Sequence, residues 1–531
     1  MYQLISAALL GVFFFHGFSS SEKAPNYSFM HQATRAPKVA YYDYIIIGGG
    51  TAGCPLAATL SQNYNVLLLE RGGSPYGNEN ITNLSEFGVP LSDLSPSSPS
   101  QDGVINARAR VLGGGSCLNA GFYTRAATTY VNTVGWDGRL VNESYVWVEK
   151  KVAFEPMVRE WQSAVRDGLV EVGIGPYNGF TYDHLDGTKI GGTIFDSDGT
   201  RHTAADLLEY ANPSRLTVLL HASAHKILFK SKGKMRPLAH GVVFRDASGR
   251  KHKAYLKRGE MNEIIVSAGA LGSPQILMLS GLGPSQQLKA HNISVVLDQP
   301  MIGQGMSDNP MNAIFVPSPV PVEICLIQVV GITPFGTYIE AASGKNFLGS
   351  NPEDKSTFRG GFILEKIMGP LSTGHLELRT RNPNDNPNVT FNYFKHPEDL
   401  RRCVHGIKVI ERVIESKSFT KFRFNSLSFP ALLNLTASAP VNLLPRHNNV
   451  SESLEQFCKG TVMTIWHYHG GCQVGKVVDQ DYKVLGVDAL RVIGGSTFNY
   501  SPGANPQATV MMLGRYDTTI LYVLFYMTIF D

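Results

Sequence analysis

Two histidines near the carboxyl end are the side chains best suited to move a proton. His467 and His469 stand two positions apart in the segment Trp466-His-Tyr-His-Gly-Gly-Cys472. An imidazole has an unperturbed pKa near ~6.5, so either ring can accept a proton at neutral pH. A lone histidine is more often a hydrogen-bonded structural residue. The segment therefore predicts a general base, and the residue types leave both rings as candidates.

A glycine-rich turn near the amino end has the setting that a dinucleotide requires. Residues 42–47 predict a buried strand, Gly48-Gly-Gly-Thr-Ala-Gly53 follows, and residues 54–60 predict the start of a helix. A second apolar run, Val66-Leu-Leu-Leu-Glu70, completes a βαβ beginning. Continuous apolar strands are typical of a parallel sheet that is buried on both faces. This order of strand, glycines and helix makes the GxGxxG pattern a specific signal.

Each residue of that motif has a physical role in dinucleotide binding. Gly48 allows a tight turn, Gly50 lets backbone N–H groups approach a pyrophosphate, and Gly53 lets the helix pack closely on the strand. The helix start supplies N–H donors and a favourable dipole for the anion. Glu70 ends the second strand and can accept hydrogen bonds from ribose hydroxyls. The motif alone does not separate NAD from FAD.

Composition sets the class of protein. The chain has 531 residues, of which 43% are hydrophobic and 17% charged, and its formal net charge is +4. This length predicts a large core and more than one domain. The low charge content argues against disorder. Since no run of Lys or Arg stands out, we expect no nucleic acid among its partners.

The amino terminus indicates secretion. Leu4–Phe15 is apolar, and the small residues Gly17 and Ser19–Ser21 follow it, so residues 1–21 are expected to be a signal peptide. The run is shorter than the ~20 residues that a membrane span needs, so no stable span is expected. N-glycans are expected at some of the N-x-[ST] sequons. They begin at Asn26, Asn80, Asn83, Asn142, Asn292, Asn388, Asn434, Asn449 and Asn499.

The six cysteines do not suggest a metal site. None of them forms a CxxC pair, so we expect no zinc site, although one or two pairs could form disulfides in an oxidising compartment. Cys54 and Cys117 lie inside glycine-rich motifs, where a small buried residue is the simpler interpretation. The six are Cys54, Cys117, Cys325, Cys403, Cys458 and Cys472.

The rest of the chain gives a coarser pattern. Residues 22–40 look like a loose leader, and the Pro-, Ser- and Asn-rich residues 74–103 look like a surface excursion. Residues 400–414 show helical spacing. Further strands are predicted at 216–220, 224–229, 241–244 and 263–266, and a second sheet at 376–378 and 389–391.

Three further segments resemble the glucose–methanol–choline (GMC) oxidoreductase family. Ala109-Arg-Val-Leu-Gly-Gly-Gly-Ser-Cys-Leu-Asn119 is similar to its first signature, and the stretch from Gly269 to Gly283 to its second. The segment around His467, with Asn505-Pro-Gln507 after it, resembles the carboxyl-terminal catalytic segment. The resemblance runs from about Tyr41 to Tyr516 and is strongest to the branch of plant HOTHEAD-like proteins and mandelonitrile lyases.

That resemblance implies an α/β fold (α+β overall) with FAD as the cofactor. A Rossmann-like FAD-binding domain is expected in three segments, 41–125, 200–312 and 462–531. A substrate domain with an antiparallel sheet is expected at 126–199 and 313–461. The resemblance also implies a disulfide between Cys403 and Cys458, and a substrate pocket that draws on residues 322–330 and 359–366.

The family also implies which residues contact FAD. Thr51, Ala52, Glu70, Arg71 and Ala224 would flank the adenosine half, beside the Gly48, Gly50 and Gly53 cradle. Val111, Gly115, Asn119, Ala120, Gly121 and Phe122 would contact the cofactor from the first signature. Trp466, His467 and Gly495 would lie near the isoalloxazine, and Pro506 and Gln507 would pass along its edge.

Catalytic roles follow from the same resemblance. In relatives the first histidine of the carboxyl-terminal segment lies over the flavin, which makes His467 the expected base. Asn505 matches the second catalytic position and can hydrogen-bond the substrate oxygen. The expected reaction is oxidation of an alcohol CH–OH group with hydride passing to flavin N5. The branch suggests long-chain ω-hydroxy fatty acids as substrates and an extracellular, cell-wall location.

Two alternatives stay open. One is hydroxynitrile (mandelonitrile) lyase activity, in which FAD is not redox-active. The other is an inactive or truncated family member, suggested by three departures from relatives. Gly494 stands where relatives have Asp, residues 347–362 look shortened, and the tail after Tyr516 is apolar nearly all round.

Overall fold

A six-stranded parallel sheet carries the glycine-rich turn. The computed structural model describes residues 25, 27–87, 97–231, 233, 235–259, 261–343, 359–438, 453–503 and 505–517. The strand order is β1-β11-β4-β3-β15-β26, and every neighbouring pair is parallel. The strands are β1 (Met30–Gln32), β11 (Leu216–Leu220), β4 (Val66–Leu69), β3 (Tyr44–Ile47), β15 (Glu263–Val266) and β26 (Leu490–Val492).

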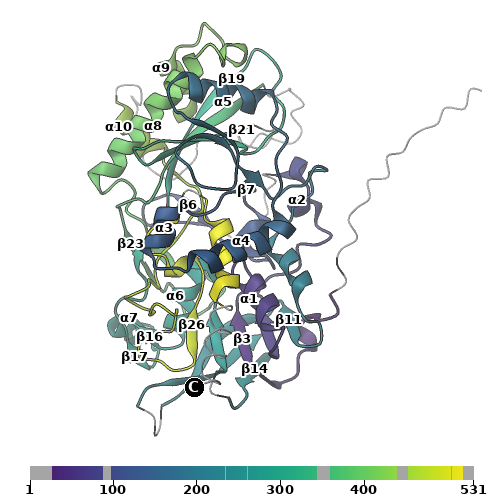
Figure 1. The fold of residues 1–531 in the computed structure, drawn as a ribbon. Coiled ribbons are helices and arrows are strands. Elements are labelled where there is room, and N and C mark those ends of the chain that lie inside the picture. Colours follow the sequence, from purple (N-terminus) through teal and green to yellow (C-terminus); the bar gives the residue numbers. More distant parts are fainter. Residues whose placement is uncertain are drawn as a thin grey trace, which may run out of the picture.

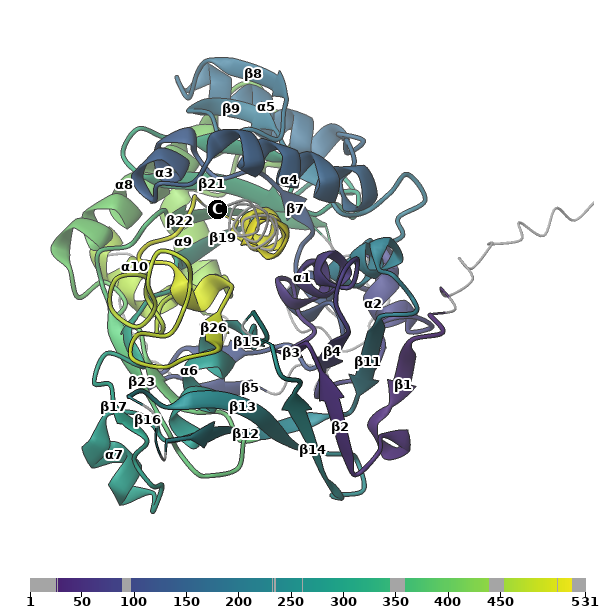
Figure 2. The ribbon, with the colours of Figure 1, turned by 60° about the horizontal axis from the view of Figure 1, so that its bottom comes forward.

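Both faces of this sheet are covered, which explains its continuous apolar strands. Every residue of β3 and β4 is buried. Helix α1 (Gly53–Leu60) packs on β3 and β4 from one side (Figure 2). On the other side lies a four-stranded sheet of β12 (Ser223–Lys230), β13 (Leu238–Arg245), β14 (Lys251–Leu256) and β2 (Val39–Tyr42). The expected βαβ beginning is confirmed.

A second, seven-stranded sheet forms the other half of the molecule (Figure 1). Its order is β25-β19-β22-β21-β20-β9-β8, antiparallel except for the β8–β9 pair. The strands are β25 (Met463–Thr464), β19 (Pro310–Pro317), β22 (Gly360–Ile367), β21 (Thr337–Ala342), β20 (Val329–Ile332), β9 (Gly187–Ile190) and β8 (Tyr177–Phe180). Helices α5 (Glu160–Glu171) and α8 (Pro397–Glu415) pack on one face.

Because side chains alternate along a strand, the seven-stranded sheet has two different faces. The face toward α5 and α8 carries Ile314, Ile363 and Ile339, which belong to a core shared with both helices. The opposite face carries Phe315 and Phe362, paired across β19 and β22, and it borders a cavity. The expected Rossmann-like domain with a second antiparallel sheet is therefore confirmed.

One interpretation of the sequence was wrong. Residues 30–32 and 39–40 of the supposed leader lie in β1 and β2, which extend the sheets through backbone hydrogen bonds that need no side-chain periodicity. Most described residues of the expected surface excursion 74–103 are exposed or half-buried, but Ile81 is buried and Asn80 and Phe87 line the cavity. The strands predicted near 376 and 389 exist as β23 (Gly374–Glu377) and β24 (Asn388–Thr390), in a small separate sheet with β18 (Gln304–Met306).

The expected disulfide is present. Cys403 in α8 is bonded to Cys458 in α10 (Leu454–Thr461), and the two half-cystines are 55 positions apart. Cys54 and Cys117 are buried free thiols, each hydrogen-bonded to a backbone carbonyl oxygen. The expected signal peptide, most of the shortened region and the tail after Asp517 lie outside the described residues.

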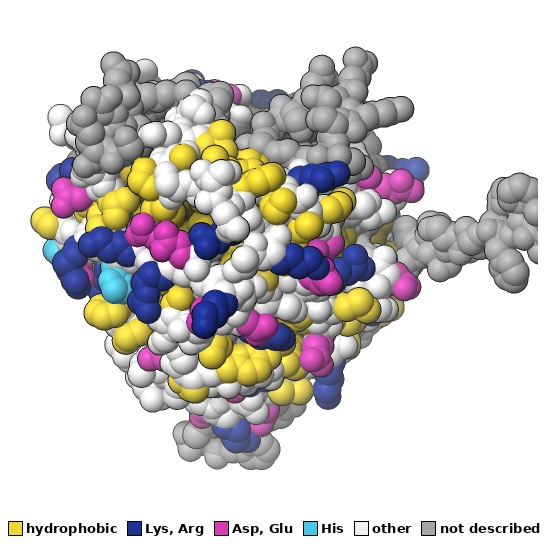
Figure 3. Space-filling model, turned by 90° about the horizontal axis from the view of Figure 1, so that it is seen from above, with side chains coloured by type: hydrophobic (Ala, Val, Ile, Leu, Met, Phe, Trp, Pro, Cys, Tyr) yellow, Lys and Arg dark blue, Asp and Glu magenta, His cyan; other side chains and the backbone are white. Residues whose placement is uncertain are grey.

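Within the described ranges, no helix combines the length and the apolar character that a membrane span requires. On the face shown in Figure 3, Lys and Arg side chains alternate with Asp and Glu, and hydrophobic side chains lie between them. No single sign of charge dominates that face, so it lacks the basic stripe of a nucleic-acid-binding surface.

Candidate active site

A cavity of about 1240 Å³ lies between the two large sheets. Its floor comes from the turn after β3 and from Glu70 at the end of β4, and its roof comes from β19, β21 and β22. The cavity therefore joins the glycine-rich turn to the segment that contains His467. All site residues expected from the sequence line it except Gly53.

The turn is shaped by close backbone contacts. Gly48 has φ +106°, and a Cβ there would lie 2.6 Å from the carbonyl oxygen of Ser267. Gly53 begins α1, where a Cβ would lie 2.0 Å from the Gly48 carbonyl oxygen. Opposite the turn, a Cβ on Gly114 would lie 2.7 Å from the Cα of Gly50. Side chains at these positions would displace the backbone, so the glycines set the shape of this end.

The turn also offers unused donors. The backbone N–H groups of Gly50 and Thr51 make no hydrogen bond within the described part of the chain, and both residues line the cavity. Free N–H groups ahead of a helix suit a phosphate. Glu70 lies beside them, its two carboxylate oxygens accepting from the N–H groups of Gly49 at 2.9 Å and Gly72 at 2.7 Å. Burial raises the pKa of Glu70, and these hydrogen bonds oppose that shift.

The first-signature residues are locked to the carboxyl-terminal segment. The Asn119 amide donates to Gln507 Oε1 at 2.9 Å, and its carbonyl oxygen accepts from the Gly121 N–H. Gln507 donates in turn to the Phe122 carbonyl oxygen at 2.6 Å. Arg201 donates to the Asn119 backbone carbonyl at 2.6 Å. The Asn119 side chain thus orders the middle of the cavity by joining two distant segments.

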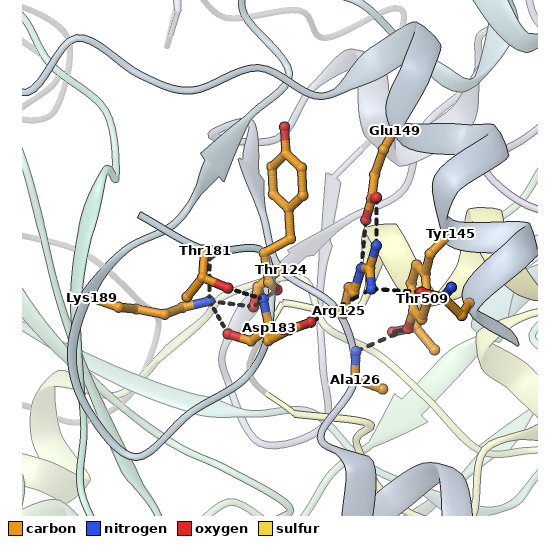
Figure 4. Close-up of polar contacts among 11 residues, drawn as sticks. Thr124, Arg125, Ala126, Tyr145, Glu149, Thr181, Asp183, Lys189 and Thr509 are labelled. Atoms are coloured by element: carbon orange, nitrogen blue, oxygen red, sulfur yellow. Dashed lines mark hydrogen bonds and ion pairs between the residues drawn. The ribbon is translucent and has the colours of Figure 1, made fainter. Parts of the chain in front are cut away.

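Behind Phe122 the chain is held from three sides (Figure 4). Arg125 makes a two-point ion pair with Glu149 of α4 (Gly138–Val152), with both distances 2.7 Å. Lys189 of β9 donates to Thr124 Oγ1 at 2.9 Å, and burial lowers its pKa to about 7. Tyr145 of α4 accepts from the Ala126 N–H. These contacts fix the segment that carries Phe122 into the cavity.

His467 lies at the far end of the cavity and is held through its backbone. Its N–H donates to Asp308 Oδ1 at 2.9 Å, while Asp308 Oδ2 accepts from the hydroxyls of Thr464 and Tyr393, both at 2.6 Å. Burial raises the pKa of Asp308 to about 6. Burial, Lys366 and His469 together lower the pKa of His467 well below its usual value, so its imidazole is neutral and one ring nitrogen carries no proton.

His469 occupies a different position. It is buried and does not line the cavity, and its Nδ1 is 3.0 Å from the His467 carbonyl oxygen. Burial lowers its pKa to about 4. Trp466, by contrast, lines the cavity with 57% of its surface exposed and has φ +59°. A bulky residue in this conformation is a backbone outlier of the kind that clusters at functional sites.

Asn505 lines the cavity near His467 and is gripped by a buried ion pair. Lys366 Nζ donates to Asn505 Oδ1 at 2.7 Å and to Glu340 Oε1 at 2.5 Å. Both charged residues have at most 1% of the side chain exposed. Sequence reasoning missed Asp308, Lys366 and Glu340. Only the stretch 359–366 hinted at Lys366, because these residues come together through strand pairing rather than a local motif.

The roof of the cavity is apolar. Six side chains of β19, β21 and β22 line it, all of them hydrophobic, and Met463 of β25 and Ile465 extend the same surface. The six are Met311, Ala313, Phe315, Ala342, Phe362 and Leu364. Of the pocket segments expected from the sequence, 322–330 contributes Ile327 and 359–366 contributes Phe362 and Leu364.

The arrangement fits an elongated dinucleotide. One end has free backbone N–H donors and the Glu70 carboxylate, which can accept from ribose hydroxyls. The other end has the neutral imidazole of His467 and the amide of Asn505. Gly494, one of the departures from relatives, also lines the cavity, with φ +127°, and a Cβ there would lie 3.6 Å from Ala52. The cavity therefore has no side chain at this position. No group of residues in the described ranges forms a metal-binding cluster.

Known proteins match most of the chain. The family described as GMC oxidoreductase matches residues 42–311 with its amino-terminal part and residues 370–514 with its carboxyl-terminal part. The chain is 52% identical to Protein HOTHEAD of Arabidopsis thaliana over 520 residues, covering 90% of this chain and 87% of that protein. It is 48% identical to an (R)-mandelonitrile lyase-like protein of the same plant, covering 92% and 91%.

A further relative and a solved structure complete the comparison. The sinalpyl alcohol oxidase of Nesocodon mauritianus is 42% identical, with 92% of this chain and 90% of that protein covered. The formate oxidase of Aspergillus oryzae has the same fold, with a TM-score of 0.77 at 19% identity, covering 92% of this chain and 99% of that one. The names of these proteins describe more than one reaction, so the reaction of this chain has to be argued from its own site.

Proposed function

Since the chain belongs to the GMC oxidoreductase family and FAD is its cofactor, we propose that it oxidises the CH–OH group of an alcohol. His467 is the general base, and Asn505 is the hydrogen-bond partner of the substrate oxygen. The observation that carries the proposal is that His467 and Asn505 both line the cavity with the apolar roof, and that Lys366, which helps to lower the pKa of His467, also donates to Asn505.

The chain's own residues supply three parts of the reaction. His467 takes the hydroxyl proton onto an imidazole nitrogen, help that is typically worth ~10²–10⁴-fold in rate. Asn505 orients the oxygen with a group that does not compete for this proton. Asp308 holds the His467 backbone in place. FAD, when bound, supplies the acceptor for the hydride that leaves the alcohol carbon.

The apolar roof favours a substrate with a long hydrocarbon part. Each buried methylene adds about 0.8 kcal/mol of transfer free energy, so Met311, Phe315 and Phe362 would select for chain length. We therefore propose long-chain alcohols, including ω-hydroxy fatty acids, as the substrate class. The 52% identity to HOTHEAD supports the same branch.

A second candidate function is hydroxynitrile lyase activity, and one similar protein supports it. The 48% identical relative is named for mandelonitrile lyase, in whose reaction no hydride moves. The family resemblance implies a second histidine over the flavin in such lyases, whereas this chain has Asn505 at the second position and so one acid–base group fewer. The amide favours oxidation over cyanohydrin cleavage.

Anaerobic mixing of the purified flavoprotein with a long-chain primary alcohol tests the proposal. The flavin absorbance near 450 nm should bleach, and His467→Ala should slow bleaching about 10²–10⁴-fold while FAD stays bound. Protein that keeps an oxidised spectrum with every alcohol but cleaves mandelonitrile would establish the lyase instead. Protein without bound flavin would indicate an inactive family member.

We also propose that the protein is secreted and glycosylated and has the domain boundaries given above. The Cys403–Cys458 disulfide supports an oxidising compartment. The sequon residues Asn83, Asn142, Asn434 and Asn499 are exposed, which N-glycosylation requires. The two large sheets, each with its own core, support the division into two domains. Expression with residues 1–21 should release the protein into the medium, which tests secretion. Glycosidase treatment of the released protein should lower its apparent mass, which tests glycosylation.

A further inference from the structure

The cavity-facing side of the seven-stranded sheet holds one buried ion pair that the proposed reaction does not use. Strand pairing places Tyr338 opposite Lys366 and Glu340 opposite Leu364, so all four side chains share the face that roofs the cavity. The side chains of this face that line the cavity are hydrophobic. Lys366 and Glu340 are charged and, like Lys189 on the same face, are covered by the protein.

An ion pair in such a place is costly to keep. Removing two charges from water costs several kcal/mol per ion, and a well-packed apolar pair is often neutral or more stable. Stability alone therefore does not account for Lys366 and Glu340. Lys366 Nζ lies 4.5 Å from the Tyr338 ring centroid, which fixes its position further.

Lys366 of the pair makes a hydrogen bond outside the sheet, to Asn505. An ammonium can only donate, so the Asn505 atom 2.7 Å from Nζ must be the amide oxygen. This contact settles which way the amide points. Glu340 acts on the same side chain through Lys366, because its Oε1 accepts from Nζ and so holds the ammonium against Asn505. An amide nitrogen has two N–H groups, which can donate into the cavity that Asn505 lines.

We propose that Lys366 and Glu340 are positioning residues that present an N–H of Asn505 to the substrate oxygen. The Lys366 charge also polarises the amide, which strengthens this N–H as a donor. When the O–H bond breaks, the proton goes to His467, and the negative charge left on oxygen is stabilised by the Asn505 N–H. As hydride leaves the alcohol carbon, this oxygen becomes the carbonyl oxygen of the product, and FAD, when bound, would supply the hydride acceptor. This inference rests on the proposed alcohol oxidation for its kinetic consequence.

The variant to test is Glu340→Met with Lys366→Met, since removing both charges avoids leaving one buried and unpaired. Flavin reduction at saturating alcohol should slow about tenfold, because a preorganised donor is lost, while KM changes less than about twofold. The flavin spectrum and the melting temperature should be retained. Glu340→Gln with Lys366→Gln serves as a polar alternative if the apolar pair fails to fold.

A double-mutant cycle decides whether the pair acts through Asn505. In an Asn505→Ala background, replacing both charges should change the rate less than about twofold. An equal slowing in both backgrounds would overturn the proposal, as would an unchanged rate in the wild-type background. The matched control is the buried pair Glu263 and Arg491 of the parallel sheet, replaced in the same way, which should affect stability and not the rate.

A binding measurement separates this inference from the proposed function. Trifluoroethanol, an alcohol with an acidic hydroxyl, should bind beside the flavin and perturb its absorbance. Its Kd should rise about tenfold in the paired variant, and not further in the Asn505→Ala background. If no alcohol reduces the wild-type flavin, the proposed oxidation fails, and this Kd still decides the role of the pair. An unchanged Kd would overturn the inference.

Discussion

At the α1 end of the cavity backbone atoms form the binding surface, whereas at the roof the side chains of a sheet form it. The turn at Gly48–Gly53 offers N–H groups and almost no side chain. The roof offers Phe315, Phe362 and their neighbours. Lys366 of the same sheet, paired with Glu340, donates to Asn505. At Gly48 and Gly53 the backbone-built end has no room for an added atom, whereas the side-chain-built end can be changed one group at a time.

The largest effect is expected at the backbone-built end. Gly53→Ala puts a Cβ 2.0 Å from the Gly48 carbonyl oxygen, so α1 must move away from the turn. We expect the purified variant to retain less than about a tenth of the wild-type FAD, measured by absorbance against protein concentration. Gly138→Ala is the control, because a Cβ there meets no atom within 4 Å. Normal FAD content in Gly53→Ala would mean that the turn does not hold the pyrophosphate.

An intermediate effect is expected from Asp308, whose carboxylate accepts from the backbone N–H of His467 in the catalytic segment. Its pKa is raised from 3.8 to about 6. Below about pH 6 the protonated carboxyl accepts the hydrogen bonds of His467, Thr464 and Tyr393 less well. Turnover should therefore fall with decreasing pH around 6, since His467 itself stays neutral there. Asp308→Asn should remove this acidic limb and lower the plateau about tenfold.

The pH dependence of stability should run in the opposite direction to that of turnover. Between pH 3.8 and about 6 the folded protein holds the Asp308 proton more tightly than the unfolded chain, so stability falls as pH rises through this window. Asp308→Asn should remove that part of the pH dependence of the melting temperature. An acidic limb that persists in the variant would assign it to another group.

The smallest effect is expected at the roof. Ala313→Phe fills space above the substrate, so kcat/KM should shift toward shorter alcohols, by about fourfold per methylene lost. A series of primary alcohols of increasing length measures this. Ile314→Val lies on the opposite face of β19 and should cost about 1 kcal/mol of stability without changing the preference. The same chain-length profile in both variants would place the substrate elsewhere.

The same contrast explains what the sequence could predict. The turn and Glu70 are local, and strand, glycines and helix follow one another within thirty residues, so pattern reasoning found them. Glu365 and Lys366 are adjacent charged residues, which in the sequence look like a surface pair. Both faces of β22 are in fact buried. In the structure the two side chains point to opposite faces, and among the described residues the Glu365 carboxyl oxygens have no hydrogen-bond partner. Which partner Lys366 meets depends on β21 and on Asn505, which no local pattern encodes.

Resemblance supplied what spacing could not. The disulfide, the choice of His467 over His469 and the contact of Phe122 with FAD came from the family. The structure contains the disulfide, and His467 and Phe122 line the cavity whereas His469 does not. Asp308 and the ion pair were missed because their roles depend on contacts more than 25 positions away in sequence. Short strands such as β1 were missed because only their backbone is used.

The Cys403–Cys458 bridge has a consequence for the lifetime of the protein among proteases. The catalytic segment begins only a few residues after Cys458, and the bridge ties it to α8. A protease that cuts the chain once between the two half-cystines produces two pieces that remain covalently joined. His467 then stays attached to the rest of the molecule, and a nicked protein would run as two fragments only after reduction.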